Sequence, residues 1–269
     1  MGPRIGIIAG SGKLPFLALS EAKKRGYACI VAGLRGEADR RVQEKADEFE
    51  WIEASELSRL VSFFKRHQVH EAIMVGKVSG HLIYKRDDVD QISRRLWAQL
   101  KERSPSFLIK AVIEFMASEG IEIKDPTFFL SPFFCQEGIL TESRPSPQVL
   151  EDIDFGWRMA KAIADLDIGQ TVIVKEKAVV AVEGIEGTDE AIKRAGKLAG
   201  EGIVAVKVSR TLQDPRIDLP AVGLKTLRAL IKAGGVALCF EADRVPFFEK
   251  EKAISLANAN GVSIAVRKS

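Results

Sequence analysis

Short apolar runs alternate with amphipathic segments along the first half of the chain. The runs at 4–9, 27–34 and 71–75 are short and continuous, which is typical of buried strands. Between them, over 14–25 and 57–67, apolar residues return at helical spacing. Because repeated strand-helix-strand units build parallel sheets, this half predicts a Rossmann-like α/β fold.

The second half repeats the alternation after a break. Residues 125–147 hold four of the ten prolines, and we interpret them as a domain junction. Two α/β domains are therefore predicted: an amino-terminal Rossmann-like domain with a parallel sheet over 1–130, and a carboxyl-terminal α/β catalytic domain over 131–269. The other predicted strands are 48–52, 171–174, 178–182, 203–208, 236–240 and 262–266, and the other predicted helices are 87–100, 104–119, 147–166, 188–199 and 224–233.

Composition excludes several classes of protein. The 40 Lys and Arg against 37 Asp and Glu give a net charge of +3, too small to attract nucleic acid by itself. No apolar run reaches the roughly 18 to 20 residues that span a bilayer. Cys29, Cys135 and Cys239 are odd in number and widely spaced, which favours buried thiols over disulfides or a zinc site. We expect a cytoplasmic protein without a nucleic-acid partner.

Two glycine-containing loops follow strands in the first half. Gly10-Ser11-Gly12 ends the first strand and opens a helix, where backbone N–H groups and the helix dipole can hold a phosphate. Pro15 replaces the third glycine of the dinucleotide fingerprint, and no Gly-Lys-Ser/Thr ending is present for a P-loop. Gly76-Lys77 follows another strand and places an ammonium at its end. The alternatives are a tight turn and a solvated lysine.

Acids and bases gather after the predicted strands of the second half. Gln213 to Pro220 holds two aspartates, an arginine and two prolines directly after strand 203–208, where ligands bind in α/β sheets. Residues 183–189 end another strand and open a helix, so Thr188 and Asp189 either cap that helix or line a site. Carboxylates suit Mg²⁺, and the cations and hydroxyls suit phosphate, so we expect phosphoryl chemistry.

Three motifs, taken in order, resemble those of a known family. They are 166–170 (LDIGQ), 182–189 (VEGIEGTD) and 213–220 (QDPRIDLP), and the opening 8–15 (IAGSGKLP) fits as well. Together they span nearly the whole chain, which is similar to the UDP-2,3-diacylglucosamine pyrophosphatase family of the bacterial lipid A pathway.

The resemblance implies a reaction and a set of site residues. The family hydrolyses the pyrophosphate of UDP-2,3-diacylglucosamine to UMP and 2,3-diacylglucosamine 1-phosphate (lipid X), with Mg²⁺ or another divalent cation. Its critical aspartate in Asp-Leu-Pro falls on Asp218, whereas position 214 need not be acidic. The carry-over also places Thr188 and Asp189 in the site, and it adds Gln170, Gln213 and Arg216.

From these observations we predict a cleft between the two domains. Asp218 and Asp189 are the expected catalytic residues and metal ligands. The expected substrate contacts are Gly10, Ser11, Gly12, Lys77, Gln170, Thr188, Lys207, Gln213 and Arg216. An asparagine or another small polar residue is common at the position of Lys77 in the family, so this chain departs from the family pattern there.

Two other functions fit the same sequence. The strand-loop-helix start permits a nucleotide-sugar or NAD-dependent oxidoreductase, which would retain its cofactor on purification. A non-catalytic protein that captures an acylated sugar would bind the substrate without releasing UMP. The sequence leaves open a homodimer and a peripheral contact with the inner membrane, and it does not show which phosphorus is attacked.

Overall fold

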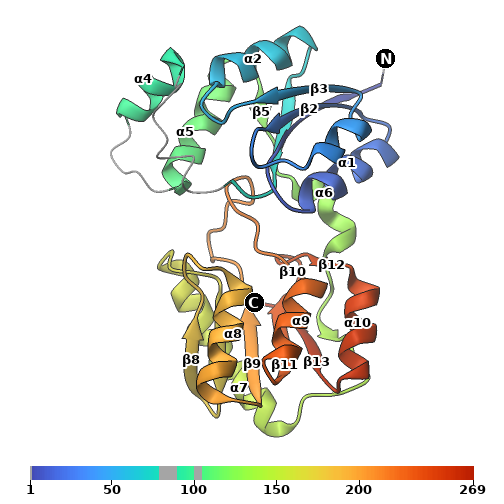
Figure 1. The fold of residues 1–269 in the computed structure, drawn as a ribbon, viewed down its shortest axis with the longest axis vertical. Helices are drawn as coiled ribbons and strands as arrows, with labels where there is room; N and C mark the ends of the chain where they lie inside the picture. The colour runs from blue at the N-terminus through green and yellow to red at the C-terminus, as the bar shows by residue number, and fades with distance from the viewer. Residues whose placement is uncertain (1, 79–89, 100–104) are drawn as a thin grey trace. The chain divides into compact units, whose positions relative to one another are not determined.

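The computed structural model describes residues 2–78, 90–99 and 105–269 (Figure 1). The chain forms two compact units, Met1–Leu130 with Asp214–Asp218, and Ser131–Gln213 with Leu219–Ser269. Both units are α/β, which confirms the predicted fold class. Of the predicted helices, residues 87–89, 100 and 104 lie outside the described part.

The first unit is built on a five-stranded parallel sheet in the order β3-β2-β1-β4-β5. On one face, Leu60 and Phe64 of α2 and Met116 of α5 pack against strand residues such as Ile30. Helix α1 buries Ala18 and Leu19. The strands are β1 (Arg4–Ala9), β2 (Ala28–Leu34), β3 (Glu48–Ile52), β4 (Glu71–Val75) and β5 (Glu122–Ile123). The helices are α1 (Leu14–Lys24), η1 (Arg40–Lys45), α2 (Leu57–Arg66), α4 (Gln91–Gln99), α5 (Pro105–Ser118) and α6 (Thr127–Leu130).

The second unit contains a six-stranded mixed sheet in the order β6-β13-β11-β9-β7-β8. Strands β9, β11 and β13 are parallel, whereas β7 runs antiparallel to both β9 and β8. The strands are β6 (Gly138–Ile139), β7 (Thr171–Lys175), β8 (Ala178–Val182), β9 (Ile203–Lys207), β11 (Gly235–Glu241) and β13 (Ser263–Arg267), and a separate pair is formed by β10 (Val222–Gly223) and β12 (Phe247–Phe248). The helices are η2 (Ser131–Phe133), α7 (Pro147–Asp165), α8 (Thr188–Ala199), α9 (Leu224–Lys232) and α10 (Lys250–Ala259).

Helices cover both faces of this mixed sheet (Figure 1). Because successive side chains of a strand point to opposite faces, Val204 and Val206 of β9 pack against α7, whereas Ile203 and Ala205 pack on the side of α8, α9 and α10. Both faces are buried, which explains why β9 reads as a continuous apolar run.

A turn that the sequence did not reveal joins β7 to β8. Glu176 and Lys177 both adopt left-handed backbone conformations, with φ of 50° and 58°, and neither is a glycine or asparagine. Their backbone N–H groups donate to the buried carboxylate of Asp152 on α7, at 3.0 and 2.6 Å. This contact stabilises an antiparallel hairpin in a unit whose alternation resembled that of the parallel first half. Helix α10 was also missed.

The three cysteines are free and buried, as predicted. Burial raises the pKa of the Cys29 thiol to about 11 and that of the Cys239 thiol to about 12. Within the residues that the structure describes, none of the helices has the length and apolar character needed to cross a bilayer.

Candidate active site

Four polar residues meet at one edge of the second sheet. Lys207 is the last residue of β9, and Glu183 directly follows β8. Thr171 is the first residue of β7, and it pairs with Lys207 because β7 is antiparallel to β9. Thr188 is the first residue of α8. The mixed strand directions therefore place the carboxyl ends of β8 and β9 beside the amino end of β7.

The ammonium of Lys207 lies at the centre of this group. Lys207 as a whole is only 5% exposed. Its Nζ donates to Thr188 Oγ1 at 2.8 Å, to Thr171 Oγ1 at 3.0 Å and to Glu183 Oε2 at 3.1 Å. The hydroxyl of Thr188 in turn donates to Glu183 Oε1 at 2.7 Å. We call these four residues the Lys207 network.

The network keeps Glu183 ionised in a largely buried position. Burial acts to raise the pKa of the Glu183 carboxyl, but the charge of Lys207 and hydrogen bonds from Thr171, Thr188 and Lys207 outweigh it and lower the pKa. A buried carboxylate and a buried ammonium thus neutralise each other, as buried charges in proteins generally require.

The motif before β7 approaches this network through its backbone. A side chain at Gly169 would place its Cβ 1.9 Å from the carbonyl oxygen of Glu183, so only glycine fits there. The carbonyl of Gln170 accepts a hydrogen bond from Val208 N at 2.9 Å, and the N–H of Glu183 donates to Thr171 O at 2.9 Å. The predicted contact residue Gln170 is itself buried.

Asp189 lies in the first turn of α8, where its charge complements the helix dipole. Its carboxylate pairs with Lys225 Nζ at 2.9 Å, and the Asp189 side chain is 19% exposed whereas that of Lys225 is 91% exposed. The lysine can therefore leave the carboxylate at small cost, since an ammonium in solvent gains little from such a pair.

Hydrogen bonds hold the chain in place after β9, over the three residues Ser209 to Thr211. Buried Glu241 accepts Ser209 N at 2.8 Å, and Lys161 Nζ donates to Ser209 O at 3.0 Å. Asp165, the last residue of α7, accepts both the N–H and the hydroxyl of Thr211, at 2.7 and 2.8 Å. We call this the β9 exit loop.

Further contacts hold the β9 exit loop. Arg210 pairs with Asp167, and Arg244 Nη1 lies 3.4 Å from the carbonyl oxygens of Arg210 and Thr211. Gln213, a predicted contact residue, accepts Arg210 N through Oε1 at 3.3 Å. These contacts therefore hold in place the start of the segment that carries the predicted catalytic residue Asp218.

Residues Asp214 to Asp218 belong to the first unit, where Ile217 packs against the core around α2 and α5. Arg216 forms a fork with Asp214, with Nε at 3.0 Å from Oδ1 and Nη2 at 2.7 Å from Oδ2. Hydrogen bonds from this guanidinium lower the pKa of Asp214. Asp218 closes the turn, with its N–H 3.4 Å from Asp214 O, and its side chain is exposed.

The two glycine loops of the first unit lie against each other. Ser11 N donates to Lys77 O at 2.7 Å and Lys77 N donates to Ser11 O at 3.0 Å, so the loops after β1 and β4 form a bridge. Gly76 has φ of 99°, and a Cβ there would lie 2.7 Å from Ser11 O. The predicted residues Gly10, Ser11 and Lys77 are therefore neighbours, and Gly12 directly follows them with φ of 93°.

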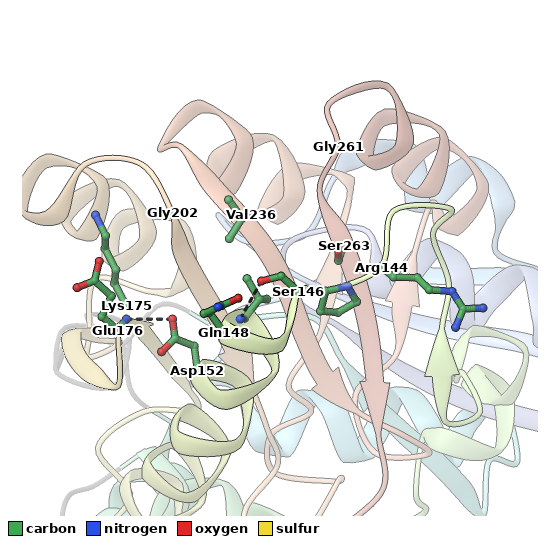
Figure 2. A pocket seen from close by; sticks show the side chains of 12 residues that line it. Arg144, Ser146, Gln148, Asp152, Lys175, Glu176, Gly202, Val236, Gly261 and Ser263 are labelled. Atoms are coloured by element: carbon green, nitrogen blue, oxygen red, sulfur yellow. Dashed lines mark hydrogen bonds between the residues drawn. The ribbon is translucent and has the colours of Figure 1, made fainter.

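Two pockets of the second unit lie at opposite edges of its sheet. The larger, of about 430 Å³, lies at the amino ends of β9, β11 and β13, and its walls include Ser146, Asp152 and Glu176 (Figure 2). Ligands of α/β sheets bind at the opposite, carboxyl edge, and the polar groups here already serve the α7 cap and the β7–β8 turn. The smaller cavity, of about 300 Å³, borders the β9 exit loop and is lined by Trp157, Lys161, Thr211, Glu241, Arg244 and Ser269.

Among the described residues, no group of three or more His, Cys, Asp or Glu side chains could hold an ion. Mg²⁺ often uses only one or two carboxylates together with water and substrate phosphates, and the exposed Asp218 and the loosely paired Asp189 suit that mode. Asp218 belongs to the first unit and Asp189 to the second, and their joint role stays a prediction.

The structure brings some of the predicted site residues together. Thr188 and Lys207 belong to one network, and Gly10, Ser11 and Lys77 to another group. Sequence analysis missed Lys161 and Glu241, which hold the β9 exit loop. The signal for Glu241 was present, because a charged residue ends an apolar strand there, as Lys207 does in β9.

The two α/β units, with polar side chains gathered at strand ends, define this chain as a two-domain α/β protein. Residues 4–133 match the model described as the LpxI N-terminal domain, and residues 136–265 match that of the LpxI C-terminal domain. The chain belongs to the LpxI family.

A curated relative matches almost end to end. UDP-2,3-diacylglucosamine pyrophosphatase LpxI of Caulobacter vibrioides is 28% identical over 276 residues, which cover 97% of this chain and 96% of the relative.

Two solved structures show a weaker similarity to the chain. A GalE-like L-threonine dehydrogenase from Cupriavidus necator is 18% identical with a TM-score of 0.29, covering 45% of this chain and 35% of its own. A phosphoribosylglycinamide synthetase from Anaerococcus prevotii is 10% identical with a TM-score of 0.29, covering 71% and 42%. Neither likeness bears on function.

Proposed function

We propose that this protein hydrolyses the pyrophosphate of UDP-2,3-diacylglucosamine in lipid A biosynthesis. Water attacks one phosphorus, the P–O–P bridge breaks, and the products are UMP and 2,3-diacylglucosamine 1-phosphate (lipid X). The observation that carries the proposal is the family match over both domains, together with a relative of this name that aligns over 97% of the chain.

The site supports this reaction through the accessibility of its acids. Asp218 is exposed at the end of a turn that the Asp214–Arg216 fork holds, so it can meet a water molecule or a metal ion. Asp189 is paired with Lys225, whose exposed side chain can be solvated by water when it leaves the carboxylate. We propose Asp218 as the group that orients water, with Asp189 as a second carboxylate of the site.

The remaining predicted contacts complete the proposal. A guanidinium carries five N–H groups, so Arg216 can hold both Asp214 and a phosphate oxygen. The bridged loops at Ser11 and Lys77 offer a rigid place for a second anionic group. Gly10, Gly12, Gln170, Thr188 and Gln213 are proposed to line the substrate.

A divalent cation, Mg²⁺ above all, is proposed to assist. When bound, it would neutralise charge on the diphosphate, and the residues that would hold it are Asp218 and Asp189.

Apolar side chains on the loops of the second unit suit an acylated substrate. Leu166, Ile168, Ile185 and Leu212 are each more than half exposed. The loops of Ile168 and Leu212 are joined by the Asp167–Arg210 and Asp165–Thr211 contacts, and Ile185 lies between Glu183 and Thr188 of the Lys207 network. Apolar side chains beside a polar network suit a substrate that has both acyl chains and a polar head group. We also propose that the enzyme is cytoplasmic and contacts the inner membrane peripherally.

Incubation of the purified protein with UDP-2,3-diacylglucosamine and Mg²⁺ tests the reaction. Equal amounts of UMP and lipid X are expected, and chelation by EDTA should stop their release until Mg²⁺ is restored. Substrate binding without UMP release at every metal tried would indicate a capture protein instead. A nicotinamide cofactor that is retained on purification and reduced by a nucleotide sugar would indicate an oxidoreductase.

A further inference from the structure

All the hydrogen-bonding capacity of the Lys207 ammonium is used inside the protein. An ammonium has three N–H groups, and Lys207 Nζ has three acceptors: Thr171, Thr188 and Glu183. The side chain is 6% exposed and that of Glu183 is 13% exposed. A phosphate could therefore reach Lys207 only by displacing one of these partners.

The hydroxyl of Thr188 is committed in the same way. It accepts from Lys207 at 2.8 Å and donates its hydrogen to Glu183 at 2.7 Å. Its proton is thus held by the carboxylate rather than offered to a ligand. Because Thr188 is the first residue of α8, these two bonds fix the start of the helix and with it the neighbouring Asp189.

Four elements are joined by this arrangement. Lys207 ends β9, Thr171 begins β7, Glu183 follows β8 and Thr188 opens α8. The close contact of Gly169 with the Glu183 carbonyl leaves no space for the loop to shift toward β7. A carboxylate in this position neutralises the buried ammonium and also orients the threonine hydroxyl.

We propose that Glu183 and Lys207 are positioning residues, which act on catalysis by holding Thr188 and Asp189 at the start of α8 and do not themselves contact the substrate diphosphate. This inference deepens the proposed function and uses its activity as a readout. It assigns a role to Glu183. It also makes Lys207 a positioning residue in place of the substrate contact that the sequence predicted.

Thr171 provides the cleanest test, because it is 0% exposed and no substrate can touch it. Thr171→Val keeps the shape but removes one acceptor of Lys207, whereas Thr171→Ser keeps the acceptor. We expect the valine variant to lower kcat about tenfold or more with KM within threefold, and the serine variant to stay close to wild type. Equal activity of both variants would overturn the proposal.

Removal of the charges separates positioning from direct contact. Lys207→Met leaves the Glu183 carboxylate buried without a cation, so kcat should fall about 10- to 100-fold. Adding Glu183→Gln removes that unpaired charge, and we expect kcat and the melting temperature to recover in part. If Lys207 contacts the diphosphate, KM rises and the double variant is no better than Lys207→Met, which would contradict the inference.

The pH dependence of stability gives a readout without substrate. The groups facing Glu183 are Lys207 of β9, Thr171 of β7 and Thr188 of α8, and together they lower its pKa against burial. In Lys207→Met burial remains without the cation, so protonation of Glu183 should stabilise the variant. The deficit in melting temperature relative to wild type should shrink from pH 8 to pH 5. A constant deficit would count against the proposal.

These outcomes are distinct from failure of the proposed function. A wild-type protein that releases no UMP rejects the proposed reaction, but the pH-dependent deficit can still be measured. An active wild type with unchanged Thr171→Val rejects the positioning role alone.

Discussion

The fork between Asp214 and Arg216 has a close counterpart elsewhere in the chain. Arg41 Nε lies 3.0 Å from Asp39 Oδ1, and its backbone N–H donates to the same oxygen at 2.9 Å, just as Arg216 N donates to Asp214 at 3.0 Å. Asp39 caps the 3₁₀ helix η1 and belongs to no predicted site. The chain therefore contains a matched pair of Asp-x-Arg turns.

At Asp214 we predict a specific loss of activity. Asp214→Asn removes the charge that holds the guanidinium, so Arg216 and the turn leading to Asp218 should become less ordered. We expect kcat/KM for UMP release to fall about tenfold, with little change in melting temperature, because a partly exposed pair contributes little to stability. Asp39→Asn should leave kcat/KM unchanged. Equal effects of the two variants would contradict the role of the fork.

The pH range of this fork follows from its pKa shift. The pKa of Asp214 is lowered from the ordinary value of about 3.9. The stabilisation is therefore complete above about pH 4 and is lost as the pH falls through the lowered pKa. Asp214 should stay ionised throughout the neutral range of the assay.

At the scale of elements, contacts at the end of β9 fix the start of the segment that leads to the predicted site residue Asp218. Lys207 anchors the strand to β7, β8 and α8, and the next residues are held by α7 and β11. The ion pair of Lys161 with Glu241 spans 2.6 Å, and the Glu241 side chain is 1% exposed. Both sides of the exit from β9 are therefore held by charged groups that are largely removed from solvent.

We predict that Glu241→Gln destabilises the second unit by about 3 kcal/mol, because Lys161 loses its partner in a largely buried site and Ser209 N loses a charged acceptor. Urea denaturation followed by circular dichroism measures this change. Glu151→Gln is the control, since its 2.7 Å pair with Lys177 is similar in length but exposed, and it should leave the unfolding curve unchanged. A similar small effect in both variants would show that the Glu241 contact is not structural.

Elements were easier to predict than their pairing. The longer strands of both sheets were predicted from the sequence, but the two-residue strands β5 and β6 were missed. The antiparallel hairpin β7–β8 depends on Asp152, which lies 24 residues before the turn. The turn itself could not be predicted, because Glu176 and Lys177 are not residue types that usually mark a turn with positive φ. Helix α10 begins after Glu249, which is also left-handed and provides no side-chain cap, so its start was not apparent.

At the scale of the whole molecule, the residues predicted for the site are divided between the two units. The sequence placed polar residues correctly after strands, since that follows from local pattern. It could not show that Ile217 packs against the core of the first unit or that the Lys207 ammonium is fully hydrogen-bonded within its network, because both depend on contacts distant in sequence. The roles of individual side chains therefore required the structure.

The exposed apolar loops lead to a prediction about substrate length. Replacing Ile185 and Leu212 together by serine should raise KM for the long-chain substrate about tenfold, since burial of an aliphatic side chain is worth about 1.5 to 3 kcal/mol. kcat and the KM of a short-acyl analogue should change little. Leu198→Ser on α8 is the control, because Leu198 is as exposed as Leu166, at 68%, but lies near the end of the helix far from Thr188. Unchanged KM in the double variant would exclude acyl contact at these loops.

The most direct test of the proposed hydrolysis is UMP release by Asp218→Asn compared with wild type. Asp218 is exposed, so the variant should fold with an unchanged melting temperature. We predict that the rate of UMP release from UDP-2,3-diacylglucosamine falls about 10³-fold or more, because the variant lacks the carboxylate that we propose orients water. A folded Asp218→Asn protein that releases UMP at the wild-type rate would contradict the account.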